Sequence, residues 1–282
     1  MAIYVNTNIA SLNAQRNLSG STESLKTSLQ RLSSGLRINS AADDPAGMAV
    51  SQSMTTQING NEQGIRNASD GISLAQTAEG ALGQIQNNLQ TIRQIAVQAA
   101  NGTISDTNRS QLQKQVDQLT QEISRIVQTT NFNGTMLLSG GNSITFQIGA
   151  SGVASNQVVA SGLDLTSGIN SYATSLTATG TIDITTTAKA SAVLSALDAD
   201  INLISNDRSQ LGAVQNRFQA VIANMSNYVQ NLKDSRSRII DTDFASETAN
   251  LTQQQILQQA GTAVLSQANQ VPQAALTLLK GG

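Results

Sequence analysis

The stretch IRNASDGISLAQTAEGALGQIQNNLQTIRQIAVQA, residues 65–99, decides the fold class of this 282-residue chain. Apolar residues recur in it at steps of three and four, which places them on one stripe of a helix. The stripe comprises Ile65, Ala68, Ile72, Ala75, Ala78, Leu82, Ile85, Leu89, Ile92, Ala96 and Ala99. It is a heptad seam with one three-residue stammer near Gly80. The pattern predicts a helix from about Pro45 to Ala100, which would span roughly 80 Å if continuous.

Five glycines interrupt this predicted helix, and each costs about 1 kcal/mol relative to alanine in a helix interior. They are Gly60, Gly64, Gly71, Gly80 and Gly83. Either the helix bends at these positions, or close packing of another segment offsets the loss.

Helical patterns also occur on both sides of residues 65–99. One runs over about 4–35 and ends at Gly35, a third begins at Ser105 or Asp106, a fourth near Ala190 and a fifth spans about 243–279. Asp44 is a plausible N-cap ahead of Pro45. A short turn at Asn101-Gly102 makes the second and third helices antiparallel.

The middle of the chain has a different pattern. Residues 143–148 alternate apolar and polar side chains, as a half-buried strand does. Residues 149–190 are rich in Gly, Ser and Thr, and we expect a hairpin followed by a surface segment, with one further strand at 181–185. The predicted fold class is therefore mainly α, a long-helix coiled-coil bundle with a small β-hairpin region.

The composition excludes several classes of function. The chain has no Cys, His or Trp, which removes thiolate chemistry, Ser-His-Asp triads and His-containing zinc sites. A net charge of -2 and 2% aromatic residues argue against nucleic-acid binding. The N-terminus has no signal-peptide pattern, and the sequence contains no run of 18 apolar residues that could cross a membrane. We expect no enzyme activity, no cofactor and no membrane partner.

The two ends carry apolar stripes without an obvious neighbour in sequence. A helix that is apolar on one face must bury that face. The termini then pair with each other and with other copies, or the chain is a monomeric helical bundle with ordinary packing stripes. The pattern alone leaves both readings open.

Several long segments resemble bacterial flagellins, in the same order along the chain. They include SLNAQR (11–16), RLSSGLRIN (31–39), NASDGISLAQT (67–77), NFNG (131–134), LGAVQNRF (211–218), QQILQQAG (254–261) and ANQVPQ (268–273). Together the matching regions cover roughly two thirds of the chain. The resemblance implies a structural subunit that assembles into the extracellular flagellar filament for swimming motility, after export as an unfolded chain.

The resemblance also implies a domain organisation and partners. Residues 1–40 with 243–282 would form an inner coiled-coil core domain, and 45–140 with 190–235 a helical outer domain. Residues 141–189 would add a β-hairpin and variable surface segment without an independent outer domain. The implied partners are other copies of the chain, an export chaperone at the C-terminal helix, and hook-junction and cap proteins.

Eight apolar residues of the terminal helices are the candidate filament-core packing residues. Their expected role is helix packing within and between subunits. They are Leu25, Leu29, Leu32, Leu36, Leu251, Ile256, Val264 and Leu265.

Residues 89–98 are similar to the segment with which many flagellins bind Toll-like receptor 5. The candidate receptor face comprises Leu89, Gln90, Arg93, Ala96, Val97 and Gln98. Thr91 stands where the family usually has Arg, and Gln115 where an acidic residue is common. Because interface arginines are often hot spots, we expect weak or absent receptor signalling. The plainer reading is a solvated helix face that the filament covers.

Two polar features have simple explanations. The acidic residues Asp43, Asp44, Asp241 and Asp243 stand at predicted helix starts, where capping explains them better than a metal site. The hydroxyl-rich stretch 174–187 matches a region that some flagellins glycosylate, but a soluble loop is the favoured explanation.

Two other classes remain as rivals. A hook–filament junction protein shares the terminal heptads, although the match at 254–273 argues against it. A cytoplasmic coiled-coil scaffold would be helical at both ends as a monomer.

Overall fold

The computed structural model describes residues 7–169 and 182–280, the last ten of these by their backbone alone. The chain forms two compact units. The terminal unit comprises Met1–Thr56 and Asn231–Gly282, and the central unit comprises Gln57–Gln230. Five long helices and two small antiparallel strand pairs make up the described residues, which confirms the predicted mainly α fold class.

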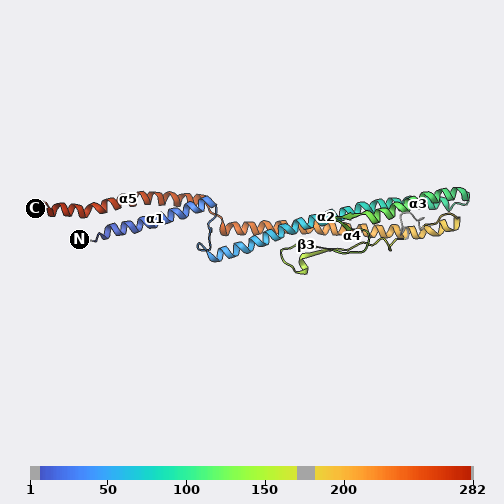
Figure 1. The fold of residues 1–282 in the computed structure, drawn as a ribbon, viewed down its shortest axis with the longest axis horizontal. Helices are drawn as coiled ribbons and strands as arrows, with labels where there is room; N and C mark the ends of the chain where they lie inside the picture. Colours follow the sequence, from blue (N-terminus) through green and yellow to red (C-terminus); the bar gives the residue numbers. More distant parts are fainter. Residues whose placement is uncertain (1–6, 170–181, 281–282) are drawn as a thin grey trace. The chain divides into compact units, whose positions relative to one another are not determined.

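The terminal unit is built on two helices that lie side by side, α1 (Ile9–Ser34) and α5 (Phe244–Lys280) (Figure 1). The Asn8 side chain caps α1 by accepting a hydrogen bond from Ser11 N at 3.1 Å. Gly35 ends the helix, as predicted, with a φ of 72° that favours glycine.

The connectors next to these helices pair through their backbones. Arg37 N donates to Ile240 O at 2.6 Å, and Thr242 N donates to Gly35 O at 3.0 Å. A β-bridge between Leu36 and Asp241 lies between these two bonds. The pairing fixes where α1 ends relative to α5.

Two of the four acidic residues at these connectors, Asp44 and Asp243, act as helix caps. Asp44 Oδ1 accepts from Gly47 N at 2.9 Å, at the start of α2 (Pro45–Ala99). Asp243 Oδ1 accepts from Ala245 N at 2.9 Å, at the start of α5. Asp43 binds the backbone N–H groups of Asn39 and Ser40, which lowers the pKa of its carboxyl group. The residues that the structure describes contain no cluster of three potential metal ligands.

The central unit packs α2 with α3 (Asp106–Thr129) and α4 (Thr187–Ile240). Ser105 caps α3, as expected, and the largest buried side chains include Leu82, Ile85, Leu89 and Ile92 of the predicted stripe. Arg109, itself buried, closes the turn between α2 and α3. Its Nη1 donates to Ala99 O at 3.0 Å and to Asn101 O at 3.1 Å.

Close packing explains three of the five glycines that interrupt the interior of α2. A β-carbon at Gly64 would overlap the Ile148 carbonyl oxygen, one at Gly60 would lie 2.6 Å from the Ala150 β-carbon, and one at Gly71 would lie 2.6 Å from the Phe218 ring. Gly80 and Gly83 have no such neighbour within 4 Å in the described residues. Because they lack a β-carbon, the first three glycines allow other segments of the chain to pack closely against α2.

The segment that packs against Gly60 and Gly64, residues 148–150, directly follows a strand of a β-hairpin. Strand β3 (Ile144–Gln147), which the alternation predicted, pairs antiparallel with β4 (Gln157–Ala160), and the short 3₁₀ helix η1 (Ala154–Asn156) lies between them. Ile148 and Val158 pack with Ala68 and Phe218 in a small cluster of their own.

Two further parts of the middle segment differ from expectation. A two-residue ladder, β1 (Asn131–Phe132) with β2 (Thr135–Met136), closes on Asn133 and Gly134, both of which have positive φ. The strand expected at 181–185 is wrong for residues 182–185, which are not in a strand.

The side chain of buried Gln113 makes the backbone hydrogen bonds with residues 182–184 that a neighbouring strand would make in a sheet. Its Nε2 donates to Ile182 O and its Oε1 accepts from Ile184 N, each at 2.7 Å. The side chains of Ile182 and Ile184 are buried, so the alternating pattern marked burial of every second residue without sheet pairing. The part of the hydroxyl-rich stretch at 174–181 lies outside the described residues.

Candidate functional site

Helices α1 and α5 meet along a heptad seam of mostly small or polar residues. Apart from Thr27 and Arg31, the residues of α1 that are buried or half-buried recur at steps of three and four, and those of α5 do the same. The α1 residues are Ser11, Ala14, Leu18, Ser21, Leu25, Ser28 and Leu32. The α5 residues are Glu247, Leu251, Gln254, Gln258, Gly261, Leu265 and Ala268.

Polar contacts fix the antiparallel register of this seam. Near one end, Asn8 Nδ2 donates to Ala268 O and Ser11 Oγ donates to Asn269 Oδ1, both at 2.7 Å. Near the other, Arg31 Nη1 lies 3.8 Å from a carboxylate oxygen of the buried Glu247. Between them, a β-carbon at Gly261 would lie 3.3 Å from Leu18 Cδ1.

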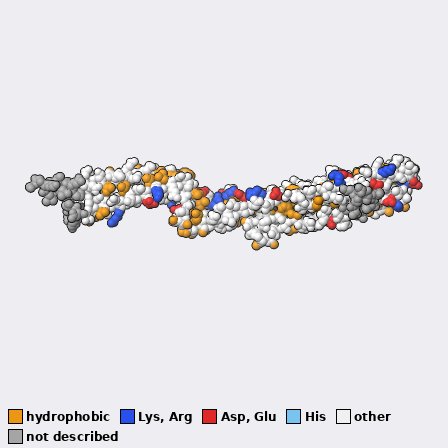
Figure 2. Space-filling view, in the orientation of Figure 1, with side chains coloured by type: hydrophobic (Ala, Val, Ile, Leu, Met, Phe, Trp, Pro, Cys, Tyr) orange, Lys and Arg blue, Asp and Glu red, His pale blue; other side chains and the backbone are white. Residues whose placement is uncertain are grey.

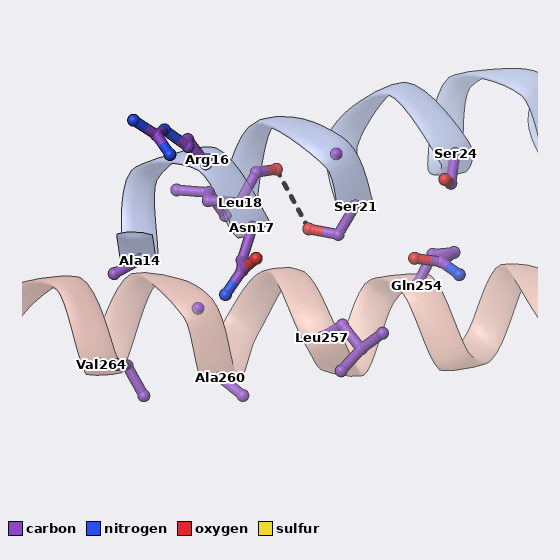
Figure 3. Close-up of a pocket in the computed structure, with 12 residues that line it drawn as sticks. Ala14, Arg16, Asn17, Leu18, Ser21, Ser24, Gln254, Leu257, Ala260 and Val264 are labelled. Carbon is purple, nitrogen blue, oxygen red and sulfur yellow. Dashed lines mark hydrogen bonds between the residues drawn. The ribbon is translucent and has the colours of Figure 1, made fainter. Parts of the chain in front are cut away.

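A groove of about 500 Å³ runs along one side of the α1–α5 seam. Its walls include Leu18, Gly20 and Ser24 of α1, and Leu257, Ala260 and Val264 of α5. Figure 3 shows Asn17 pointing from α1 toward α5, whereas Val264 and Ala260 point away from α1. The dashed line is the bond from Ser21 Oγ to Leu18 O, so the Ser21 hydroxyl is satisfied within its own helix.

The eight candidate packing residues divide into two groups. Five of them are half-buried, namely Leu25, Leu32, Leu36, Leu251 and Leu265. Leu29, Ile256 and Val264 are 51%, 59% and 57% exposed, so these three do not pack within the chain.

We define the exposed apolar set as the large hydrophobic residues that α1 and α5 leave uncovered. It comprises Ile9, Leu12, Leu29, Phe244, Ile256, Leu257 and Val264. Most of the exposed large hydrophobic residues of the described chain lie in the terminal unit, and hydrophobic atoms are visible among uncharged polar ones on the face in Figure 2. Exposed apolar residues in such number mark a surface that another molecule covers.

Sequence analysis missed the small residues of the seam and four members of this set. Its choice of residues followed large apolar side chains, whereas Ala14, Ser21 and Ser28 carry the tightest intrachain contact of α1. Their exact seven-residue spacing was the signal that identifies them.

The candidate receptor face is narrower than the sequence indicated. Leu89 and Ala96 are fully buried in the core of the central unit, which leaves Gln90, Arg93 and Gln98 exposed, with Val97. Arg93 Nε lies 2.6 Å from Asp198 Oδ1, and this hydrogen bond lowers the pKa of Asp198. Thr91 and Gln115 line one shallow groove of about 490 Å³ between α2 and α3.

No helix in the described part of the chain combines the length and hydropathy needed to cross a membrane.

Comparisons with known proteins agree with a role in assembly. The model of the bacterial flagellin N-terminal helical region matches residues 5–143, and that of the C-terminal helical region matches residues 194–279. A flagellin of Halalkalibacterium halodurans is 42% identical over 280 residues, 99% of this chain and 100% of that one. Flagellin D of Vibrio cholerae is 34% identical over 376 aligned positions, again 99% of this chain and 100% of that one. A solved flagellin of Bacillus cereus is 32% identical, covers 57% of this chain and 88% of its own, and has a TM-score of 0.49.

Proposed function

This chain belongs to the bacterial flagellin family, and from that premise we propose that the exposed apolar set is the surface through which its copies pack in the filament. Its function is that of a structural subunit of the bacterial flagellar filament, and it is not an enzyme. Because flagellar filaments are extracellular, membership of the family implies that the assembled chain is extracellular.

The observation that carries the proposal is that α5 has two sets of residues, one that packs against α1 and one that remains exposed. Gly261, Leu265 and Ala268 face α1, whereas Ile256, Leu257 and Val264 remain exposed. Covering a Val, Leu or Ile side chain fully is worth about 1.5–3 kcal/mol. A neighbouring copy that covers these side chains would therefore gain free energy that the single chain leaves unused.

Seeded polymerisation tests this proposal. Purified monomer is mixed with sheared filament fragments, and filament growth is followed by electron microscopy and sedimentation. Ile256→Gln and Val264→Gln should lower the extent of growth, whereas Ser266→Gln, an exposed polar position on the same helix, should leave it unchanged. Equal growth of all three variants would contradict the assignment of these side chains to the subunit interface.

We propose that the same helix binds an export chaperone before assembly. The exposed side chains of Ile256, Leu257 and Val264 offer an amphipathic helix to a hydrophobic groove on a partner. The chain would leave the cell unfolded through the flagellar export channel and meet hook-junction and cap proteins at the filament ends. A chain that ends at Asn250 should no longer capture the chaperone.

The domain assignment is also a proposal. We propose an inner coiled-coil core domain of residues 1–40 with 243–282, and a helical outer domain of residues 45–140 with 190–235. Residues 141–189 supply the hairpin and surface segment without an independent outer domain. The antiparallel α1–α5 seam supports the first of these assignments.

We further propose that recognition by Toll-like receptor 5 is weak. The exposed part of the face offers Arg93, but Asp198 already binds this side chain, and Thr91 lacks a positive charge. A cell reporter assay should show a low response to the wild type and a higher one to Thr91→Arg. A strong response to the wild type would contradict this proposal.

A further inference from the structure

The apolar seam of α4 repeats with a period of seven residues. Five of the seven buried residues of α4, namely Ala190, Leu197, Ile204, Leu211 and Phe218, are each seven positions apart, whereas Asp200 and Val229 lie outside this repeat. A shift of α4 along α2 by one heptad would place Ile204 where Leu197 lies, and Leu211 where Ile204 lies. Such a shift exchanges aliphatic side chains of similar volume, which cores tolerate well. Apolar packing therefore discriminates poorly between the two registers over this part of the seam.

A ladder of polar side chains runs between the same two helices. On α2, Glu79, Gln86 and Arg93 are also seven positions apart. Their partners on α4 come in reverse order, as antiparallel helices require, and comprise Gln215, Arg208, Ser205 and Asp198. We call these seven residues the polar ladder.

The contacts of the polar ladder are short and specific. Gln215 Nε2 donates to Glu79 Oε2 at 2.9 Å, and Arg208 Nη2 lies 3.6 Å from Glu79 Oε1. Arg208 Nη1 donates to Gln86 Oε1 at 2.5 Å, and Gln86 Nε2 donates to Ser205 Oγ at 3.3 Å. Arg93 approaches Asp198 with Nε at 2.6 Å and with Nη2 at 3.4 Å.

A one-heptad shift removes both charge pairs of the ladder in one direction. With α4 moved so that each residue is replaced by the one seven positions later, Arg93 faces Ser205 in place of Asp198. Glu79 then faces Gln215 in place of Arg208, and Ile222 in place of Gln215. Oppositely charged residues that flank a coiled-coil seam set the choice and orientation of the partner helix, and the two charge pairs of the ladder are partly exposed residues of this kind. We infer that the polar ladder fixes the register of α4 against α2 in the central unit.

A change of register would alter the surface of the central unit as well as its stability. A seven-residue shift moves the surface of α4 by about 10 Å along α2. The exposed side chains that the central unit offers to other molecules would change place, although the aliphatic seam would stay filled. Phe218 against Gly71 is a second register contact between the same two continuous helices, and the ladder acts together with it.

Engineered cysteines can report the register, because the natural chain contains no cysteine. Spin labels attached at Asn87→Cys of α2 and Asn206→Cys of α4, both exposed positions outside the ladder, report the register as a distance. A shift of one heptad displaces one label by about 10 Å along the helix relative to the other. The distance distribution of the full-length monomer is measured by pulsed electron paramagnetic resonance, with far-UV circular dichroism as a check of folding.

Reversing a charge in this background tests the inference. Arg93→Asp should raise the ratio of the shifted to the native distance population by at least about fivefold, which corresponds to about 1 kcal/mol. Adding Asp198→Arg to Arg93→Asp should restore the original ratio. A matched control, Arg125→Glu, reverses an exposed charge on α3 outside the ladder and should leave the ratio unchanged.

The result that overturns the inference is equally clear. If Arg93→Asp lowers the melting temperature and leaves the ratio of the two distance populations unchanged, the ladder is a set of surface ion pairs that does not select the register. If Arg93→Asp with Asp198→Arg fails to restore the ratio while the helix content is retained, the effect does not come from their pairing.

Discussion

Replacing Gly64 with alanine should destabilise the central unit, although the same change at Gly80 of the same helix should stabilise it. In an open helix interior, alanine is about 1 kcal/mol more favourable than glycine. At Gly64 the new β-carbon would overlap the Ile148 carbonyl oxygen and lie 2.6 Å from the Ile148 carbonyl carbon and 2.8 Å from Met225 Cε. A backbone atom cannot rotate away as a side chain does, so either the segment at Ile148 shifts or it detaches.

The size of the loss follows from these two outcomes. Overpacking that forces the backbone to shift typically costs about 1–3 kcal/mol. Detachment would expose Ile148 and Val158, which are 9% and 1% exposed, at about 2 kcal/mol for each side chain. After the helix-propensity gain of about 1 kcal/mol, we expect Gly64→Ala to lower the free energy of unfolding by up to about 2 kcal/mol if the segment shifts, and by about 3 kcal/mol if it detaches.

Gly80→Ala is the matched control, because a β-carbon at Gly80 meets nothing within 4 Å. It should raise the free energy of unfolding by about 0.5–1 kcal/mol. Urea and thermal denaturation of both variants, followed by far-UV circular dichroism, measure the difference. If Gly64→Ala were as stable as Gly80→Ala, the close approach of Ile148 to α2 would be refuted.

Three further changes test other contacts. Gln113→Leu should lower the free energy of unfolding by about 2–4 kcal/mol, because buried Ile182 O and Ile184 N both lose their partner; an unchanged urea midpoint would contradict this. The Lys189 ammonium and Thr185 lower the pKa of Asp183 to about 2, so its contribution is present above pH ~4 and is lost as the pH falls through 2. Because this carboxylate is 46% exposed, Asp183→Asn should cost less than about 1 kcal/mol at pH 7 and nothing near pH 2 in urea titrations. Gly261→Val should reduce the hydrogen-exchange protection of α1 in assembled filaments, since Leu18 leaves no room for a branched side chain, whereas Gly20→Ala should not.

Local chemistry made the long helices and their ends predictable. The stripe from Ile65 to Ala99 lies in α2, and Gly35, Asp44 and Ser105 end or begin helices as their residue types indicate. The alternation at 143–148 also located β3, because sheet periodicity is a local property.

Contacts between distant segments were not predictable in the same way. The alternation at 181–185 resembled a strand because Ile182 and Ile184 are buried, but a side chain 69 residues away satisfies their backbone. Leu29, Ile256 and Val264 fit an apolar stripe, yet the side of a helix that meets its partner depends on which small residues permit close approach. Leu89 and Ala96 were already members of the buried stripe of α2, so their burial beneath the candidate receptor face could have been anticipated.

The Arg109 contact at the turn between α2 and α3 has a consequence for folding kinetics. The carbonyl groups of Ala99 and Asn101 obtain their partner only when the first turn of α3 has formed, because Arg109 lies in that turn. Closing so short a loop takes about 10–100 ns, far faster than pairing segments that are distant in sequence. We therefore expect the end of α2 and the start of α3 to form as one cooperative hairpin early in folding. Arg109→Ala would then slow folding of the central unit more than it accelerates unfolding.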